Sequence, residues 1–347
     1  MLVALAAAVI LAAVSVALIA LPGEGRGEQG ASGPSHTPVT PPSQGSPGLR
    51  LLVADVPPFL LDVDRGTVQP ITGLPTTGDR GASVLPLGKE ALVLSYRYCA
   101  RCQNSSAYVV RRGSTVATGL GTALDFVPSR EGNGVWRLTQ DAGRCTIREV
   151  GFDGRPLRAA RGVRCGTDPI AELPAGLFLS YTGPQGNDAH NALLKPDGSV
   201  VRLPYQDAQP VIGNLVLTGI DQRTPLLLHD VASGASERLS WPARLHFGLG
   251  EVTGQPNGYL ATVDFARYSP KHRYDLWLLD TRTRRWQHLP GMPAHLIPKV
   301  TDVEWTADGR VVILSGHFLG VWRPGEPRLV VRRVKPPRQP GNQFVIW

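Results

Sequence analysis

Tyrosine recurs together with arginine or histidine in three polar segments, YRYCARCQNSSA (96–107), YTGPQGNDAHN (181–191) and FARYSPKHRYD (265–275). Tyrosine supplies contact area and arginine supplies directed hydrogen bonds, a composition typical of binding surfaces. Polar and aromatic residues also collect in the long loops of any β-protein, which is the simpler explanation. From the first interpretation we expect a binding surface made of Tyr96, Arg97, Tyr98, Arg101, Tyr181, His190, Arg267, Tyr268, Lys271, His272, Arg273 and Tyr274.

Sequence signatures of catalysis are missing. The chain has no G-x-S-x-G elbow, no H-E-x-x-H, no glycine-rich phosphate loop and no acidic repeat of the calcium-binding type. His229 and Asp230 are adjacent on a predicted strand, so their side chains point to opposite faces and cannot act together directly. We expect no catalytic residue, no metal and no cofactor. A channel-lining set of carboxylates could still bind a cation or act on a small substrate: Asp125, Glu251, Asp302 and Glu304.

The chain contains four cysteines, Cys99, Cys102, Cys145 and Cys165. A zinc site would need two close pairs, and a redox Cys-x-x-Cys would need a βαβ context; the sequence shows one close pair and no such context. Cys145 and Cys165 flank a hairpin that turns at Asp153-Gly154, which brings them near each other. We therefore predict two disulfides, one between these residues and one joining Cys99 to Cys102, and a compartment outside the cytoplasm.

A strand-turn-strand pattern that recurs seven times must position these residues. Strands of this kind at a spacing in the low forties are typical of β-propeller blades. The sequence thus predicts an all-β domain over 49–347, a seven-bladed β-propeller of four-stranded antiparallel blades. The turns lie at Gly66, Gly113, Gly154, Gly198, Gly234, Thr283 and Gly325.

Two details of the repeats predict how the ring is built. The third unit is expected to place its fourth strand at RPLRAAR (155–161). The first unit lacks an innermost strand, and the chain ends in an unassigned strand, NQFVIW (342–347). We expect that strand to complete the first blade and close the ring, which removes exposed sheet edges. Deleting it should destabilise the whole ring.

Two of the repeats are similar to known families. VEWTADGRVVILSG (303–316) resembles the W-S-P-D-G repeat of TolB-type and other WD40-like bacterial propellers. LWLLDTRTRRWQHLPG (276–291) resembles the strand pair of kelch repeats, without the kelch double glycine, and the Trp-Asp dipeptide of true WD40 blades is also missing. The resemblance covers 50–347 in architecture. It implies the fold and, for function, only a binding platform.

The N-terminus predicts a membrane segment and a tether. Residues 2–21 form an apolar run with Ser15 as its one polar residue, and at about 1.5 Å per residue a helix of this length spans roughly 30 Å, enough to cross a bilayer. We expect a transmembrane anchor or signal segment over 1–22, with the anchor favoured over a cleaved signal peptide. No Lys or Arg precedes the run. Residues 23–48 are rich in Gly, Pro and Ser and are predicted to form a flexible, disordered linker.

Composition narrows the class of partner. The formal net charge is +8, almost all from arginine, a bias that GC-rich coding alone can produce but that also suits an anionic cell-wall ligand. No nucleic-acid-binding motif is present. We expect a single-pass cell-membrane protein whose propeller, outside the cytoplasm, binds an envelope protein or a ligand. The alternative is an extracytoplasmic hydrolase or lactonase with its site at the mouth of the propeller channel.

Overall fold

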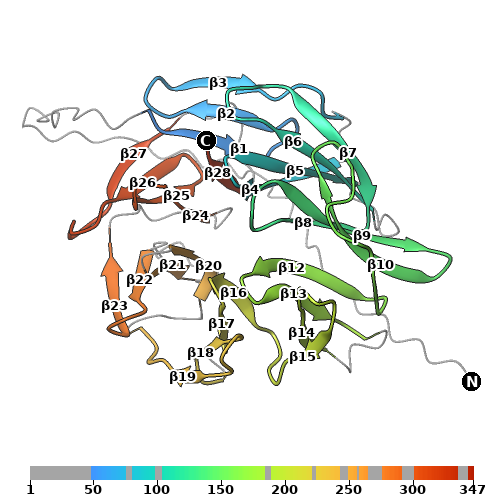
Figure 1. Cartoon of the computed structure of the whole chain (residues 1–347). Helices are drawn as coiled ribbons and strands as arrows, with labels where there is room; N and C mark the ends of the chain where they lie inside the picture. Colours follow the sequence, from blue (N-terminus) through green and yellow to red (C-terminus); the bar gives the residue numbers. More distant parts are fainter. Residues whose placement is uncertain are drawn as a thin grey trace, which may run out of the picture. The chain divides into compact units, whose positions relative to one another are not determined.

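The computed structural model describes residues 48–75, 80–97, 104–183, 189–220, 224–242, 249–255, 258–264, 276–290, 301–334 and 343–347. Within them the chain forms 28 strands in seven four-stranded sheets, and no helix. Neighbouring strands of every sheet pair antiparallel. Each sheet is one blade of a β-propeller (Figure 1), so the predicted fold class is confirmed for the described residues.

The strands of a blade follow one another from the ring centre outward. In that order, blade one contains β28 (Phe344–Ile346), β1 (Arg50–Val53), β2 (Phe59–Asp62) and β3 (Thr67–Pro70); blade two β4 (Arg80–Leu87), β5 (Glu90–Arg97), β6 (Ser105–Val110) and β7 (Ala117–Ala123); blade three β8 (Asp125–Pro128), β9 (Gly134–Asp141), β10 (Arg144–Gly151) and β11 (Arg161–Val163); blade four β12 (Thr167–Leu173), β13 (Gly176–Tyr181), β14 (His190–Leu194) and β15 (Val200–Arg202). Blade five contains β16 (Gln209–Ile212), β17 (Leu215–Thr218), β18 (Leu227–Asp230) and β19 (Ser236–Arg238); blade six β20 (Leu249–Gln255), β21 (Tyr259–Asp264), β22 (Leu276–Asp280) and β23 (Arg285–Leu289); blade seven β24 (Thr301–Trp305), β25 (Val311–Ser315), β26 (Phe318–Trp322) and β27 (Val330–Arg333).

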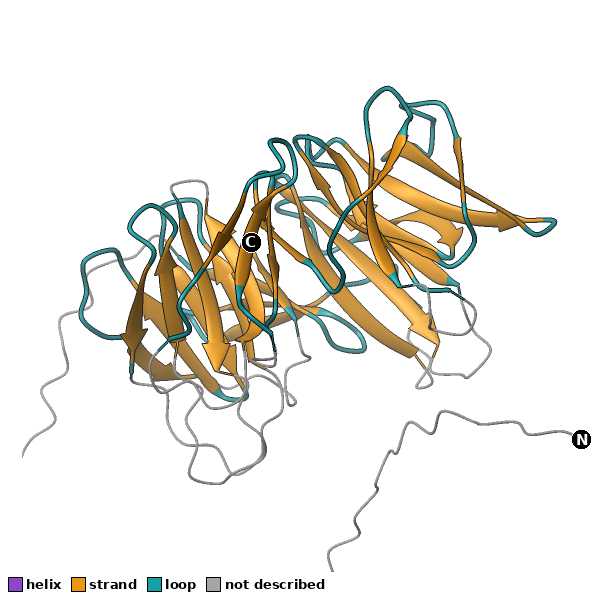
Figure 2. Cartoon of the chain, turned by 90° about the horizontal axis from the view of Figure 1, so that it is seen from below, coloured by secondary structure: helices purple, strands orange, loops and turns teal. Residues whose placement is uncertain are grey.

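The innermost strands close into a ring. Strand β4 contacts β8, and the same contact repeats through β12, β16, β20 and β24 to β28, which in turn contacts β4. Figure 2 shows the strands of the blades running between two sides of the propeller. Because strand direction alternates within a blade, the second-to-third loops lie on the same side as the blade-to-blade connections. We call this side the loop face and the other side the opposite face.

The core lies between blades. Each of the seven apolar clusters among the described residues joins two neighbouring blades, for example Leu51 and Phe59 of blade one with Val312 and Leu314 of blade seven. A strand of a propeller blade is covered on both faces by its neighbours, so its buried residues need not alternate. Strand β25 shows this, since all of its residues are buried. The blades are therefore stabilised mainly by the neighbours they pack against.

Ring closure depends on both ends of the domain. Strand β28 pairs antiparallel with β1, and Leu52 lies opposite Val345, as the sequence predicted. Asp302 of β24 adds a polar connection, because its buried carboxylate accepts a hydrogen bond from the Phe344 backbone N–H at 2.7 Å. Arg332 of blade seven also pairs with Asp64 of blade one at 3.1 Å. The seam between blades seven and one is thus held by backbone pairing, a buried carboxylate and an ion pair.

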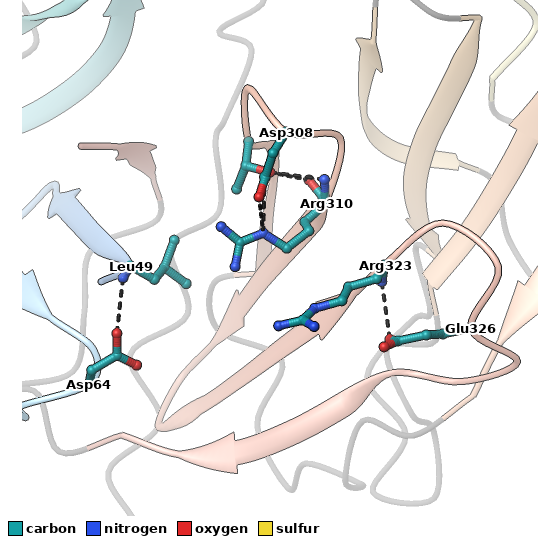
Figure 3. Close-up of polar contacts among 7 residues, drawn as sticks. Leu49, Asp64, Asp308, Arg310, Arg323 and Glu326 are labelled. Carbon is teal, nitrogen blue, oxygen red and sulfur yellow. Dashed lines mark hydrogen bonds and ion pairs between the residues drawn. The ribbon is translucent and has the colours of Figure 1, made fainter. Parts of the chain in front are cut away.

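Short polar contacts fix the turns around this seam (Figure 3). The Asp64 carboxylate accepts the Leu49 N–H, the Glu326 carboxylate accepts the Arg323 N–H, and Asp308 pairs with Arg310. In the turn after β26, Gly325 has φ +89°, a left-handed conformation that glycine adopts without steric cost. A glycine at this position is what makes the turn recognisable in the sequence.

One predicted strand was wrong. The fourth strand of blade three is Arg161–Val163, which follows the segment predicted for it and shares only Arg161 with it. Residues 152–160 form a long connection instead, in which Leu157 N–H donates to the Glu149 carbonyl and Pro156 makes an isolated bridge with Val150. This connection lies on the opposite face.

The N-terminal segment is outside the described residues. The chain divides into two units, Met1–Gln44 and Gly45–Trp347, and everything described belongs to the second. The predicted membrane segment and most of the predicted linker therefore stay predictions. Across the described ranges, no helix has the length and apolar character needed to cross a membrane.

Candidate functional site

Three side chains of blade four and the connection before it stack at the loop face. Tyr181 is the last residue of β13 and His190 the first of β14, directly opposite it in the strand pairing. Their ring centroids are 4.9 Å apart with planes tilted by 47°. The guanidinium of Arg164, which lies in the connection from blade three, sits 4.0 Å from the centroid of the Tyr181 ring. We call these residues the Arg164–Tyr181–His190 stack.

The stack is held in place by packing and by a cation–π contact. Tyr181 is 4% exposed, so its ring is fixed in the blade and forms a rigid platform. Arg164 is exposed, and a cation over an aromatic face contributes about 0.5–1 kcal/mol at such a site. The arrangement places a guanidinium at a fixed position on the loop face.

A disulfide ties down the connection that carries Arg164. Cys145, near the start of β10, is bonded to Cys165, with a Cα–Cα distance of 5.2 Å. This confirms the predicted pairing of these cysteines. Cys165 follows Arg164 directly, so the bridge fastens the blade three to blade four connection to blade three. Cys99 and Cys102 lie outside the described residues, and their pairing stays a prediction.

Two carboxylates lie at the loop-face ends of neighbouring innermost strands. Asp125 is the first residue of β8 and Asp168 the second of β12, and β8 contacts β12. Both strands start at the loop face. Burial raises the pKa of Asp125 to about 6. The hydrogen bond from the Phe126 N–H lowers this pKa, and the negative charge of Asp168 raises it further. Burial among protein atoms also raises the pKa of Asp168, although its side chain reaches solvent.

The other predicted channel carboxylates separate from this pair. Asp302 accepts hydrogen bonds from the backbone N–H groups of Val303 and Phe344, so its role is to hold the seam. Glu304 is on β24 and Glu251 on β20. For the described residues, no group of three or more His, Cys, Asp or Glu side chains is arranged to hold a metal ion.

The raised pKa of Asp125 gives a testable pH dependence. In the folded protein the Asp125 carboxyl group stays protonated up to about pH 6, whereas in the unfolded chain it loses its proton near pH 3.8. The contribution of Asp125 to the free energy of unfolding is therefore fully present below 3.8 and lost as pH rises to about 6. One pKa unit corresponds to about 1.4 kcal/mol. Because the carboxylate is partly solvated, we expect Asp125→Asn to stabilise the protein at pH 7 by roughly 1–2 kcal/mol.

Denaturant unfolding of both proteins between pH 4 and 8 checks this prediction. The gain from Asp125→Asn should shrink toward pH 4. A residual slope is expected in both proteins, because the pKa values of Asp168 and Glu149 are also raised. A gain that is the same at every pH would contradict the assigned cause.

The remaining predicted binding residues are only partly described. Tyr181 and His190 are brought together in the stack. Tyr96 and Arg97 lie at the end of β5, opposite Gly81 and Arg80 of β4, and so at the loop face by strand order. The others lie outside the described residues: Tyr98, Arg101, Arg267, Tyr268, Lys271, His272, Arg273 and Tyr274.

The separation of His229 from Asp230 is confirmed. His229 Nε2 lies 3.0 Å from Thr218 Oγ1 and His229 Nδ1 lies 2.6 Å from Ser236 Oγ. The carboxylate of Asp230 accepts backbone N–H groups of the following turn instead. Burial lowers the pKa of His229, so this histidine is a neutral member of a hydroxyl network inside blade five.

Sequence reasoning did not select Arg164 or Asp168. The predicted surface used the second-to-third loops, whereas Arg164 lies in a blade connection and Asp168 is the second residue of the strand that follows this connection. The signal that could have found Arg164 is its position next to Cys165, since a disulfide in a short connection marks a segment whose geometry is fixed.

Comparison with known proteins agrees with the fold. No family model matches the chain. Over 99 residues it is 29% identical to the Tol-Pal system protein TolB of Nitratidesulfovibrio vulgaris, a match that covers 27% of this chain and 20% of that protein. The chain thus spans about a fifth of the length of this relative.

Solved structures are similar over much greater lengths. A protein of unknown function from Desulfotomaculum acetoxidans superposes with a TM-score of 0.55 and 9% identity, over 86% of this chain and 98% of that one. The periplasmic gluconolactonase PpgL of Pseudomonas aeruginosa gives a TM-score of 0.54 and 12% identity, over 86% and 99%. At such identities the likeness concerns the fold alone. The chain therefore has a β-propeller fold, and one short segment of it is similar in sequence to TolB.

Proposed function

We propose that this protein is a membrane-tethered propeller, located outside the cytoplasm, that binds an envelope protein or ligand through its loop face. The observation that carries the proposal is the Arg164–Tyr181–His190 stack, fixed in place by the Cys145–Cys165 disulfide. A rigid aromatic platform with a presented guanidinium binds at low entropic cost, because little freedom is lost when the partner arrives.

The proposed compartment is supported by the disulfide. Structural disulfides persist in oxidising compartments and are rare in the cytoplasm. Tethering rests on the apolar run at 2–21 and the linker at 23–48. The relative with the short sequence match is named as a Tol-Pal system protein, which makes a protein the first partner to test. An anionic cell-wall ligand would suit the net charge of +8.

Site-specific photo-crosslinking in intact cells tests this proposal. A photoreactive residue at Arg144, exposed at the loop face beside Cys145, should capture a defined partner. The same probe at Arg155, which is 87% exposed on the opposite face, should not. Adding Arg164→Ala to the Arg144 probe should reduce the adduct at least tenfold, since truncating an arginine that contributes strongly to an interface costs about 2 kcal/mol or more.

A matched control separates binding from folding. Arg155→Ala removes an exposed arginine from the opposite face and should leave the Arg144 adduct unchanged. If the Arg144 probe gives the same amount of crosslinked product with Arg164 and with Arg164→Ala, this surface does not bind the partner. A second probe at Tyr268, a position selected from the sequence, reports on the rest of the predicted surface.

A hydrolytic alternative is favoured by one observation, the pair of Asp125 and Asp168. A carboxyl group whose pKa is raised to about 6 can exchange a proton near neutral pH. Lactone hydrolysis by the full chain that is lost in Asp125→Asn and kept in Arg164→Ala would support this alternative. A protein without lactone hydrolysis whose Arg144 crosslink is lost in Arg164→Ala and kept in Asp125→Asn would support the binding function.

A further inference from the structure

A cavity of about 250 Å³ lies between blades three and four on the opposite face, away from the Arg164–Tyr181–His190 stack. Blade three contributes Trp136 of β9 and the segment leading into β11. Blade four contributes the start of β13, the end of β14 and the turn between β14 and β15. The cavity has room for roughly eight water molecules, at about 30 Å³ each, so it suits a small ligand.

One wall of the cavity is apolar and contains a buried donor without a partner. Trp136, Leu177 and Leu194 line it and are all buried. Trp136 is 5% exposed, and its indole Nε1 has no hydrogen-bond partner among the described residues. Buried donors of this kind are rare in native structures and call for an explanation, a missing ligand being one.

The other wall is cationic, with Arg158, Arg161 and Lys195. The charge of Arg158 is already compensated, because its guanidinium pairs with Glu149 at 2.8 Å and with Glu172 at 3.4 Å. It also lies 5.4 Å from the centroid of the Trp136 ring. Arg161 and Lys195 have no ion-pair partner among the described residues, so their charges are available to a ligand.

The turn of blade four places Arg161 at this wall. Gly198 has φ +88°, and a Cβ there would lie 2.7 Å from the Arg161 Cζ. The guanidinium therefore rests on the turn only because glycine leaves the space. Asp197 of the same turn feels both cations, but its Oδ1 already accepts the Ser199 N–H at 2.8 Å and the Ser199 hydroxyl at 2.7 Å.

We propose that this cavity binds a small organic carboxylate that carries an apolar group. Arg161 and Lys195 hold the carboxylate by charge-assisted hydrogen bonds, the strong kind. The apolar group packs against Leu177 and Leu194 of the apolar wall, and the Trp136 N–H is left to donate to an oxygen of the ligand. A bare inorganic anion would leave that wall uncovered, and a neutral apolar ligand would leave both cations unused. The chemistry fits a free small acid or the C-terminal carboxylate of a peptide.

Titration of the detergent-solubilised full chain with 3-phenylpropionate tests the proposal, with tryptophan fluorescence and calorimetry as readouts. We expect saturable binding, with the fluorescence change lost in Trp136→Phe. Arg161→Met and Lys195→Met should each weaken binding about tenfold. Asp197→Asn should tighten it about threefold, because it removes a competing negative charge. Arg111→Met, an exposed arginine in the corresponding turn of blade two, is the matched control and should bind as wild type.

Chemical variants of the probe decide which ligand is bound. The neutral amide 3-phenylpropionamide and inorganic phosphate should both bind at least tenfold more weakly than the acid. A short peptide ending in phenylalanine that binds more tightly than the acid identifies a chain terminus as the source, and weaker binding identifies a free small acid. Equal binding of acid and amide, or acid binding that both cation variants leave unchanged, would overturn the site.

Discussion

Removing residues 344–347 is expected to abolish cooperative unfolding of the whole propeller. The truncation deletes β28, so β1 loses its inner partner. The apolar cluster at the seam loses Phe344, and the cluster between blades one and two loses Val345 and Trp347. The truncation also leaves the buried Asp302 carboxylate without the Phe344 N–H. A buried carboxylate that loses one of its hydrogen-bond donors is destabilised, at a cost of roughly 1–3 kcal/mol or more.

Two single substitutions separate the contribution of the buried Phe344 side chain from that of the Asp302 hydrogen bond. Phe344→Ala should destabilise the domain by about 3–5 kcal/mol, the usual cost of emptying a fully buried aromatic site. Asp302→Asn keeps the shape and loses the charged acceptor, so we expect about 1–3 kcal/mol. Both are measured as the free energy of unfolding in denaturant.

The exposed neighbour Arg333→Ala is the control and should change little. A truncated protein that keeps its near-ultraviolet circular dichroism and a cooperative transition would show that β28 covers an edge without closing the ring.

Replacing Cys145 and Cys165 together by alanine is the second large effect we expect. A cross-link that closes a loop of about 20 residues restricts the unfolded chain, which contributes roughly 3 kcal/mol in the chain-entropy model. The free energy of unfolding of the double variant should therefore be lower by that amount, and its midpoint should lie at a lower denaturant concentration. The Arg144 crosslink should fall too, since the connection that carries Arg164 loses its tie to blade three.

Reduction supplies the control for this experiment. Dithiothreitol should lower the stability of the wild-type protein toward that of the double variant. It should change the variant much less, because only the short predicted Cys99–Cys102 loop is left to open. If the two proteins unfold at the same denaturant concentration before reduction, the bridge does not restrain the unfolded chain in the way the model requires.

Strand order and ring closure can be predicted because each depends on local patterns. Turns at Gly198 and Gly325 need a left-handed residue, and glycine there is visible in the sequence. The strand at 342–347 can be assigned to blade one because that unit lacks a member. The fourth strand of blade three is not predictable in the same way, because the segment after the turn at Gly154, RPLRAAR, has no alternation and the strand begins only at Arg161.

The candidate sites are less predictable because they combine residues from different blades. Nothing in the sequence indicates that Arg164 lies over Tyr181, or that Asp125 feels the charge of Asp168. Strand position alone groups Asp302 with the channel carboxylates, and only its hydrogen bond to Phe344 reveals its structural role. Side-chain pairing across blades depends on tertiary packing, which periodicity does not encode.

The pairing of β1 with β28 also determines when the ring can close during synthesis of the chain. Residues 50–53 leave the ribosome long before residues 344–346 have been made, and sequence-distant contacts of this kind form late and slowly. In the interval the nascent chain carries an unpaired strand edge and uncovered apolar residues, the features that recruit chaperones and favour misassembly. The ring of blades therefore cannot close, and the propeller cannot finish folding, until β28 has been synthesised.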